Sequence, residues 1–137
     1  MSKPNVTVTL ASNGDGDVVK NLVLHSGQTF EGLDWHDIYP HWLLARIEDE
    51  PAGCIQVCVS KPVGRLEILS ISPALGHRNR ARVVKALVLQ GMATLRLGGV
   101  GMAVGLIPFE FKGYKKLVKR RGGTVIGSGN LLARRLM

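Results

Sequence analysis

A cluster of basic residues in the middle of the chain is the clearest candidate for binding chemistry. Four positive side chains lie close together there, namely Arg78, Arg80, Arg82 and Lys85. Guanidinium and ammonium groups bind phosphate oxygens through short, charge-assisted hydrogen bonds. At the start of a helix, unpaired backbone amides and the helix dipole add to the attraction for an anion. The cluster therefore predicts a phosphate site, and the alternative interpretation is a solvated basic helix start.

The charges of the chain are divided unevenly between its two halves. Residues 1–75 carry five bases against nine acids (net −4) and residues 76–137 carry thirteen against one (net +12), which together give the net charge of +8. Such an excess predicts an anionic partner for the second half. A polyphosphate cofactor, a nucleic acid and an acidic protein all satisfy it, and charge does not choose among them.

The two cysteines indicate structure rather than chemistry. Cys54 and Cys58 belong to one strand-like apolar run, where four residues span about 13 Å, too far for a disulfide. No third or fourth soft ligand lies nearby, so we expect no metal site. We interpret both thiols as small buried side chains. Neither a Ser/His/Asp set nor a phosphate-loop sequence stands out.

The composition is that of a globular protein. The chain has 137 residues, 45% hydrophobic and 20% charged, which fits a single domain over residues 1–137. No window approaches the roughly 18 consecutive apolar residues of a membrane helix, and no signal peptide is visible. We therefore expect a soluble, cytoplasmic protein that does not bind membranes.

Hydrophobic periodicity predicts the elements that must position the basic cluster. The strongest signal is a helix over residues 79–97, whose buried stripe comprises Val84, Leu87, Val88, Met92 and Leu95. An apolar hairpin and a further strand precede it, and a buried strand follows it. In full, we expect strands at 5–10, 42–47, 53–59, 65–72, 100–107, 124–126 and 131–136, and helices at 18–24, 29–37, 79–97 and 109–121.

The order of these elements is β-α-α-β-β-β-α-β-α-β-β. It predicts an α/β (α+β) fold with a mixed, mostly antiparallel sheet flanked by helices. The strand, long helix and strand in the second half imply one parallel crossover within that sheet.

Three local patterns, in this order, resemble the GNAT N-acetyltransferase superfamily. The segments Trp42-Leu-Leu-Ala-Arg and Gly53-Cys-Ile-Gln-Val are similar to the family hairpin. Leu66-x-x-Leu69-x-Ile71-x-Pro73 is similar to the strand before the family's cofactor loop, and the basic stretch from Arg78 is similar to that loop and its helix. With the terminal strands, the resemblance covers nearly the whole chain.

The resemblance implies acetyl-coenzyme A as acyl donor and an amine, on a small molecule or a protein, as acceptor. It places the pantetheine along the strand at Leu69, Ser70 and Ile71, in a cleft where this strand splays from residues 100–107. The Ile71 amide would polarise the thioester carbonyl, as a donor fixed in advance of the reaction. The pyrophosphate would lie on the amides of residues 79–84, with cofactor contacts from Arg78, Asn79, Arg80, Ala81, Arg82 and Val83.

The resemblance also implies catalytic groups. Glu67 is similar in position to the general base of many members, although a structural or solvated carboxylate is the alternative. Tyr114 is the candidate general acid, one turn before the position at which the family places its tyrosine. A group of residues falls in the region where the family often binds its acceptor, and ordinary packing is the alternative for it: Asp34, Trp35, His36, Tyr39 and His41.

The sequence departs from the family at the cofactor loop. The family pattern Arg-x-x-Gly-x-Gly is met by Arg78-Asn-Arg-Ala81-Arg-Val83, in which both glycines are replaced and the loop is expected to be two residues longer. Glycine allows the backbone to approach a phosphate closely. The extra arginines can replace part of the lost backbone contact with side-chain contacts.

Three functions therefore remain at the level of sequence. The first is an N-acetyltransferase. The second is a catalytically weak or inactive protein of the same fold, phage-encoded members included, which acts by binding a partner protein. The third is a nucleic-acid-binding module that uses the basic residues 115–121, although no aromatic side chain is interleaved with them as a stacking platform. Strands near the C-terminus could also pair two copies into a homodimer.

Overall fold

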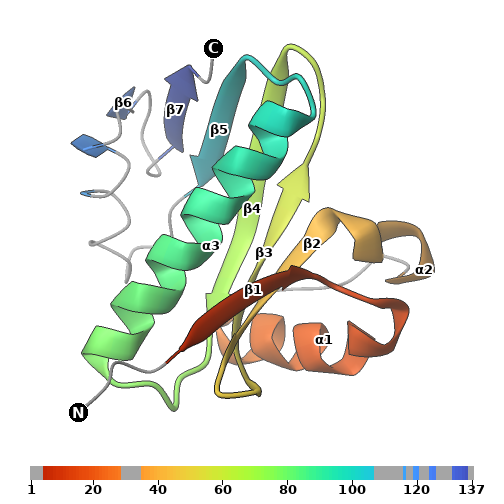
Figure 1. The fold of residues 1–137 in the computed structure, drawn as a ribbon, viewed down its shortest axis with the longest axis vertical. Helices are drawn as coiled ribbons and strands as arrows, with labels where there is room; N and C mark the ends of the chain where they lie inside the picture. Colours follow the sequence, from red (N-terminus) through yellow and green to blue (C-terminus); the bar gives the residue numbers. More distant parts are fainter. Residues whose placement is uncertain are drawn as a thin grey trace.

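The computed structural model describes residues 5–28, 35–106, 116, 119–120, 124–125 and 131–135. In this part of the chain one seven-stranded sheet is present, with strand order β1-β2-β3-β4-β5-β7-β6 (Figure 1). The strands are β1 (Val6–Leu10), β2 (Trp42–Ile47), β3 (Glu50–Cys58), β4 (Val63–Ile71), β5 (Met102–Leu106), β6 (Thr124–Val125) and β7 (Leu131–Arg135). Only the β4–β5 pair is parallel.

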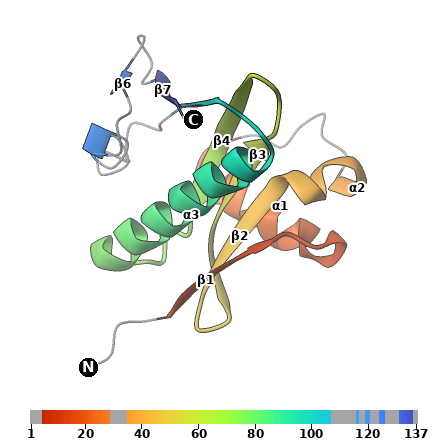
Figure 2. The same cartoon turned by 45° about the horizontal axis from the view of Figure 1, so that its top comes forward.

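Helices cover both faces of the sheet (Figures 1 and 2). The long helix α3 (His77–Leu97) connects β4 to β5 and packs on one face, whereas α1 (Gly16–His25) packs on the other. The short helix α2 (Trp35–Ile38) and the 3-10 turns η1 (Asn13–Asp15) and η2 (Tyr39–His41) complete the second layer. The predicted fold class is confirmed.

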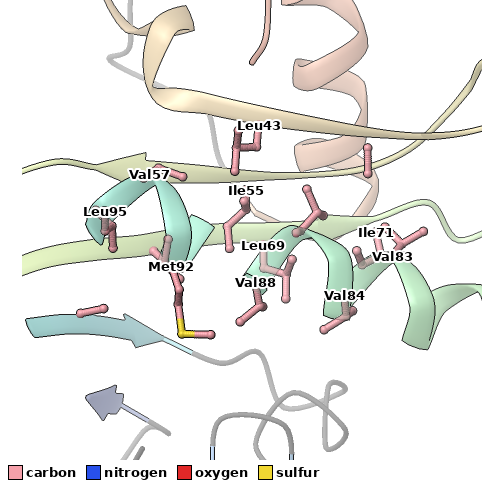
Figure 3. Packing of buried hydrophobic residues seen from close by; sticks show 14 of the residues in the cluster. Leu43, Ile55, Val57, Leu69, Ile71, Val83, Val84, Val88, Met92 and Leu95 are labelled. Atoms are coloured by element: carbon pink, nitrogen blue, oxygen red, sulfur yellow. The ribbon is translucent and has the colours of Figure 1, made fainter. Parts of the chain in front are cut away.

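The buried residues form two clusters, one on each face. The α3-face core is drawn in Figure 3. It consists of Leu43, Ala45, Ala52, Ile55, Val57, Leu66, Leu69, Ile71, Val83, Val84, Leu87, Val88, Met92, Leu95, Val100 and Ala103. The α1-face core consists of Ala11, Val19, Leu22, Val23, Trp35, Trp42, Leu44 and Cys54. The predicted apolar stripe of the long helix lies entirely in the first cluster.

Close packing of α3 on the sheet depends on a glycine within the helix. A Cβ on Gly91 would lie 2.7 Å from Cδ2 of Leu66 on β4. A larger residue at this position would therefore separate the helix from the strand. Because α3 lies so near β4, its first turn is held in a fixed place beside the end of that strand.

The hairpin between β2 and β3 is tighter than expected. The predicted loop over residues 48–52 shrinks to the two residues Glu48 and Asp49, whose φ values are 49° and 70°. Two consecutive residues in the left-handed region match a type I′ turn, which suits the twist of a hairpin. The strand consequently begins at Glu50, and a register shift beside Ala45 and Arg46 accommodates Pro51 and Ala52.

Other predicted boundaries shift by a few residues. The helix predicted at 18–24 extends over Gly16–His25, and the one predicted at 29–37 is described only as α2 (Trp35–Ile38). Most of the helix predicted at 109–121 lies outside the described residues. Within it, Lys116, Lys119 and Arg120 are helical and exposed.

Candidate functional site

Strand β4 loses one of its two neighbours halfway along its length. Its first half pairs with β5 from Val63↔Met102 to Leu66↔Gly105, while its other edge pairs with β3 as far as Ile71. Beyond Leu66, no described strand pairs with the β5 side of β4. Within the described part of the chain, residues 67–71 therefore present a backbone edge without a partner strand, which we call the β4 free edge.

A β-bulge lies at the point where this edge begins. Between the pairs Gln56↔Glu67 and Cys54↔Ser70, β4 has one residue more than β3. Ile68 within the bulge has φ of 54°, a left-handed conformation that costs a β-branched residue free energy. Bulges bend a strand and redirect the neighbouring backbone groups. Here the redirected segment is Leu69–Ile71.

The hydrogen bonds to β3 show which backbone groups face the free edge. The Ser72 amide donates to the Ala52 carbonyl at 2.8 Å. Because donors alternate along a strand, Ser70 also faces β3, and the Ile71 amide and the Leu69 carbonyl face the free edge. The Ile71 amide, which the family resemblance implies as the group that polarises the thioester carbonyl, therefore lies on the side of β4 away from β3.

The start of α3 supplies further donors. Gly76 is the N-cap residue, and its carbonyl accepts the Arg80 amide at 2.9 Å. The preceding amides, on His77, Arg78 and Asn79, belong to the first turn and have no acceptor within the helix. A Cβ on Gly76 would meet no atom within 4 Å, so the space before this turn is open. This end of α3 has the chemistry of an anion site.

The arginines of the cluster surround this helix start. Arg78 is exposed, whereas Arg80 and Arg82 are half-buried. Arg82 Nη1 donates to Asn79 Oδ1 at 3.3 Å, which ties two of the predicted residues to each other. Ala81 is exposed, so the residue that replaces the first family glycine does not obstruct the interior.

Helix α3 starts slightly before the predicted phosphate site, so Arg78 is already helical. Because Gly76 caps α3, the helix begins two residues earlier than predicted, and the connection from β4 is only residues 72–76. Amides beyond Asn79 are used within α3, so those that can receive an anion are at 77–79 rather than 79–84.

Val83 was predicted as a cofactor contact, but its side chain packs into the protein. It is 0% exposed and belongs to the α3-face core. Its Cγ1 lies 2.8 Å from the position that a Cβ on Gly53 would occupy. A valine rather than a glycine at this position follows from the need to fill the core.

Glu67, the predicted base, pairs with a neighbouring arginine. Its Oε1 lies 3.5 Å from Nη1 of Arg65, and its side chain is 28% exposed. Burial, followed by the Glu67 charge, raises the pKa of the nearby Cys58 thiol. The ion pair with Arg65 is the arrangement expected if Glu67 is a structural carboxylate, the alternative to a general base. Tyr114 lies outside the described residues.

Aromatic residues predicted near the acceptor site form a packed group. The rings of Trp35 and Tyr39 lie 6.2 Å apart, those of Trp35 and Trp42 lie 6.5 Å apart, and Trp35 Nε1 donates to the Asn13 carbonyl at 2.9 Å. These contacts support the packing interpretation for Trp35 and Tyr39. His41 is exposed, whereas Asp34 and the side chain of His36 lie outside the described part of the structure.

A network of polar side chains beside the β4 free edge was not predicted, although one of its members, Ser70, was named as a cofactor contact. Ser70 is 0% exposed, and its hydroxyl meets Ser26 Oγ at 3.1 Å and Gln28 Nε2 at 3.0 Å. Burial raises the pKa of the adjacent Cys54 thiol to about 12, although a hydrogen bond with Ser70 lowers it in part. A serine within the apolar run Leu69-Ser70-Ile71 was the available signal for this network. Nothing in the local sequence marked Ser26 or Gln28.

Two other kinds of site are absent from the described residues. No group of three or more His, Cys, Asp or Glu side chains among them could hold a metal ion. None of the described helices combines the length and apolar character required to cross a membrane.

Comparison with solved structures identifies the fold. A GNAT-family acetyltransferase from Staphylococcus aureus Mu50 superimposes with a TM-score of 0.74 at 12% identity, over 97% of this chain and 100% of that one. A putative acetyltransferase from Salmonella typhimurium, solved with its cofactor acetyl-CoA, gives 0.73 at 13% identity over 96% and 94%. N-acetylglutamate synthase from Neisseria gonorrhoeae, complexed with coenzyme A and N-acetyl-glutamate, gives 0.73 at 16% identity over 99% and 36%.

These similarities show that the chain has the GNAT fold. It spans only about a third of the length of the synthase. By sequence, no protein-family model and no curated protein matches the chain.

Proposed function

We propose that this chain is an acetyl-CoA-dependent N-acetyltransferase. The observation that carries the proposal is the juxtaposition of the β4 free edge with the arginine-rich first turn of α3, across the five-residue connection 72–76. One element offers unpaired backbone groups for an amide-containing chain, and the other offers amides and guanidinium groups for phosphates. Structures of the same fold that hold acetyl-CoA or coenzyme A support this assignment.

Each part of the site has a distinct task in this proposal. The first-turn amides of α3, with Arg78, Arg80 and Arg82, would hold the pyrophosphate. The pantetheine would run along the edge at Leu69–Ile71, where the Leu69 carbonyl already accepts a hydrogen bond from Gln28 Nε2 at 2.9 Å. The Ile71 amide would donate to the carbonyl oxygen of the acyl group. When bound, acetyl-CoA supplies an acetyl group activated as a thioester.

Acyl transfer then requires two proton movements. The amine nitrogen bonds to the carbonyl carbon as the carbon–sulfur bond breaks, so the amine must lose a proton and the departing thiolate must gain one. The Ile71 amide would stabilise the negative charge that builds on the oxygen. Glu67 and Tyr114 are the proposed base and acid, and Glu67 would have to exchange its contact with Arg65 for the amine.

A cofactor-binding protein without acyl transfer is the second candidate. The ion pair between Arg65 and Glu67 favours it, because it occupies the carboxylate expected to act as the base. Such a protein would bind acetyl-CoA at the same edge and act through a partner protein.

Calorimetric titration with acetyl-CoA tests the site directly. Arg78→Ala combined with Arg80→Ala should weaken binding at least tenfold, equivalent to about 1.4 kcal/mol. Arg96→Ala is the matched control, because it removes an exposed arginine from the opposite end of the same helix. Equal affinity of the double variant and the wild type would overturn this placement of the phosphates, and no binding by wild type at millimolar ligand would overturn the function.

Release of free thiol on addition of amines separates the two candidates. An acetyltransferase releases coenzyme A in an amine-dependent manner. A protein that binds acetyl-CoA with unchanged affinity, but releases no thiol with small-molecule amines or lysine-containing peptides, supports the second candidate.

A further inference from the structure

The carboxamide of Gln28 is held at the β4 free edge by three contacts. Its Nε2 lies 2.9 Å from the Leu69 carbonyl oxygen, 3.0 Å from Ser70 Oγ and 3.0 Å from Ser26 Oγ. The Gln28 backbone amide also donates to the Val23 carbonyl at 3.2 Å, which ties the residue to the end of α1. A side chain 41 residues away in sequence thus occupies the carbonyl that faces the open side of β4.

These contacts determine which way the carboxamide points. A backbone carbonyl can only accept a hydrogen bond, so the Gln28 atom that meets Leu69 must be the NH₂ group. Both serine hydroxyls are placed to donate to carbonyls, Ser26 to Val23 at 2.9 Å and Ser70 to Ile68 at 3.2 Å, which leaves their lone pairs for Gln28. The remaining polar atom, Oε1, receives no hydrogen bond from any described residue.

Gln28 Oε1 belongs to a side chain that lies beside the proposed site of acyl transfer. The Leu69 carbonyl and the Ile71 amide face the same edge of β4, two residues apart. Gln28 therefore lies next to the donor that the proposed function assigns to the acyl carbonyl. Because the Leu69 carbonyl already accepts a hydrogen bond from Gln28, a bound pantetheine would form its hydrogen bonds from Ile71 onward.

We propose that Gln28 is a positioning residue for the acyl acceptor, and that its Oε1 accepts a hydrogen bond from the attacking amine; this inference rests on the proposed function. An uncharged hydrogen-bond acceptor such as Oε1 suits this role, because the amine must attack the acyl carbon in its neutral form and not as an ammonium ion. A carboxylate would hold the ammonium form by charge, whereas a carboxamide orients one N–H and leaves the nitrogen lone pair free to attack. The chemical class recognised is a primary amine.

Steady-state kinetics with n-butylamine test the proposal, because this probe carries little beyond the reacting group. Gln28→Met keeps the length of the side chain and removes its hydrogen bonds. We expect KM for n-butylamine to rise about tenfold, the equivalent of one hydrogen bond to an amine, while the Kd for acetyl-CoA changes less than about twofold. Gln90→Met is the matched control, since Gln90 is an exposed glutamine on α3.

The other outcomes each have one meaning. An unchanged KM in Gln28→Met overturns the proposal, and so does an equal loss of acetyl-CoA affinity, which would make Gln28 part of the cofactor site. Absence of acetyl-CoA binding in the wild type instead overturns the proposed function itself.

A measurement on the wild-type protein covers the case in which the variant does not fold. The NH₂ protons of Gln28 should exchange slowly with water in side-chain amide NMR spectra. Their signals should move when n-butylamine is added to the protein saturated with coenzyme A. Signals that stay fixed up to 100-fold more amine than cofactor would contradict the role of Gln28.

Discussion

The two faces of the sheet are built from different chemistry. The α3-face core contains only apolar side chains, with Leu87, Leu95 and Val83 at 0% exposure. The opposite face combines aromatic rings with buried or half-buried polar groups, among them Ser70 and Gln28.

This difference indicates a division of labour. Apolar burial contributes most of the stability of a domain and makes no demand on direction. Hydrogen-bonded networks contribute less net free energy but fix the orientation of the groups they join. The α3 face therefore carries stability and holds β4 in place, while the α1 face orients polar atoms at the edge where chemistry is proposed.

The largest effect should come from a cavity on the α3 face. Leu87→Ala should destabilise the protein by about 2–5 kcal/mol, because it removes fully buried methyl groups and leaves a void. Urea unfolding followed by circular dichroism measures the change. Leu97→Ala is the control on the same helix, since Leu97 is 88% exposed and its truncation should cost less than about 0.5 kcal/mol. Similar losses in both variants would contradict the assignment of stability to this face.

A smaller, pH-dependent effect should come from the α1 side. Asp15, at the entry to α1, accepts hydrogen bonds from the Ser12 amide and hydroxyl at 2.8 and 3.0 Å and from Arg46 Nη2 at 3.1 Å. Burial raises the pKa of this carboxyl, but the Ser12 hydrogen bonds and the Arg46 charge and hydrogen bond outweigh it, so the net pKa is lowered. Asp15→Asn should cost about 1 kcal/mol at pH 7.

The sign of the shift gives the pH window. A lowered pKa in the folded state adds stability above the unfolded value of about 3.9, and this is lost as the pH falls through the folded pKa. The difference in unfolding free energy between wild type and Asp15→Asn should therefore be fully present above the unfolded pKa of about 4 and shrink as the pH falls through the lower folded pKa. Asp17→Asn, at an exposed position two residues along, is the control. A difference that stays constant down to the lowest pH would refute the electrostatic account.

The smallest effect concerns the two cysteines of β3, one fully buried and one half-buried. Cys54 is 0% exposed and burial raises its pKa to about 12, whereas Cys58 is half-buried with a pKa raised by burial and by Glu67. A raised pKa lowers the thiolate fraction, so at neutral pH a thiol reagent should modify Cys58 slowly and Cys54 only after unfolding. Mass spectrometry of Cys58→Ser with and without urea isolates Cys54. Equal rates in the two conditions would show that this end of the sheet is open.

Much of the fold could be predicted because the apolar pattern is regular. The stripe of α3, with side chains recurring every three or four residues, and the strand runs of β2, β3 and β4 each follow a single period. Boundaries were less accurate where backbone geometry, not hydrophobicity, decides them. The left-handed backbone of Glu48 and Asp49 makes the hairpin loop shorter than predicted. The N-cap at Gly76 places the helix start at His77, two residues before the predicted start.

The site was predictable only in part. Arg78, Arg80 and the Ile71 strand could be proposed as site residues because charge and the family-like motif mark them in one short stretch. The sequence motif does not show which face of a helix is buried, so it did not reveal that the Val83 side chain belongs to the α3-face core. Ser26 and Gln28 carry no local signal, since their role depends on contacts with a strand more than 40 residues away.

The sequence by itself determined the elements, the apolar faces and the concentration of positive charge at one helix start, because each is a property of neighbouring residues. The tertiary structure alone decided that β4 loses its partner at Leu66, that its bulge turns backbone groups outward, and that Gln28 meets the Leu69 carbonyl there. Register and long-range contact follow from how whole elements pack. No local period encodes them, so the open edge at which acyl transfer is proposed became visible only in the assembled sheet.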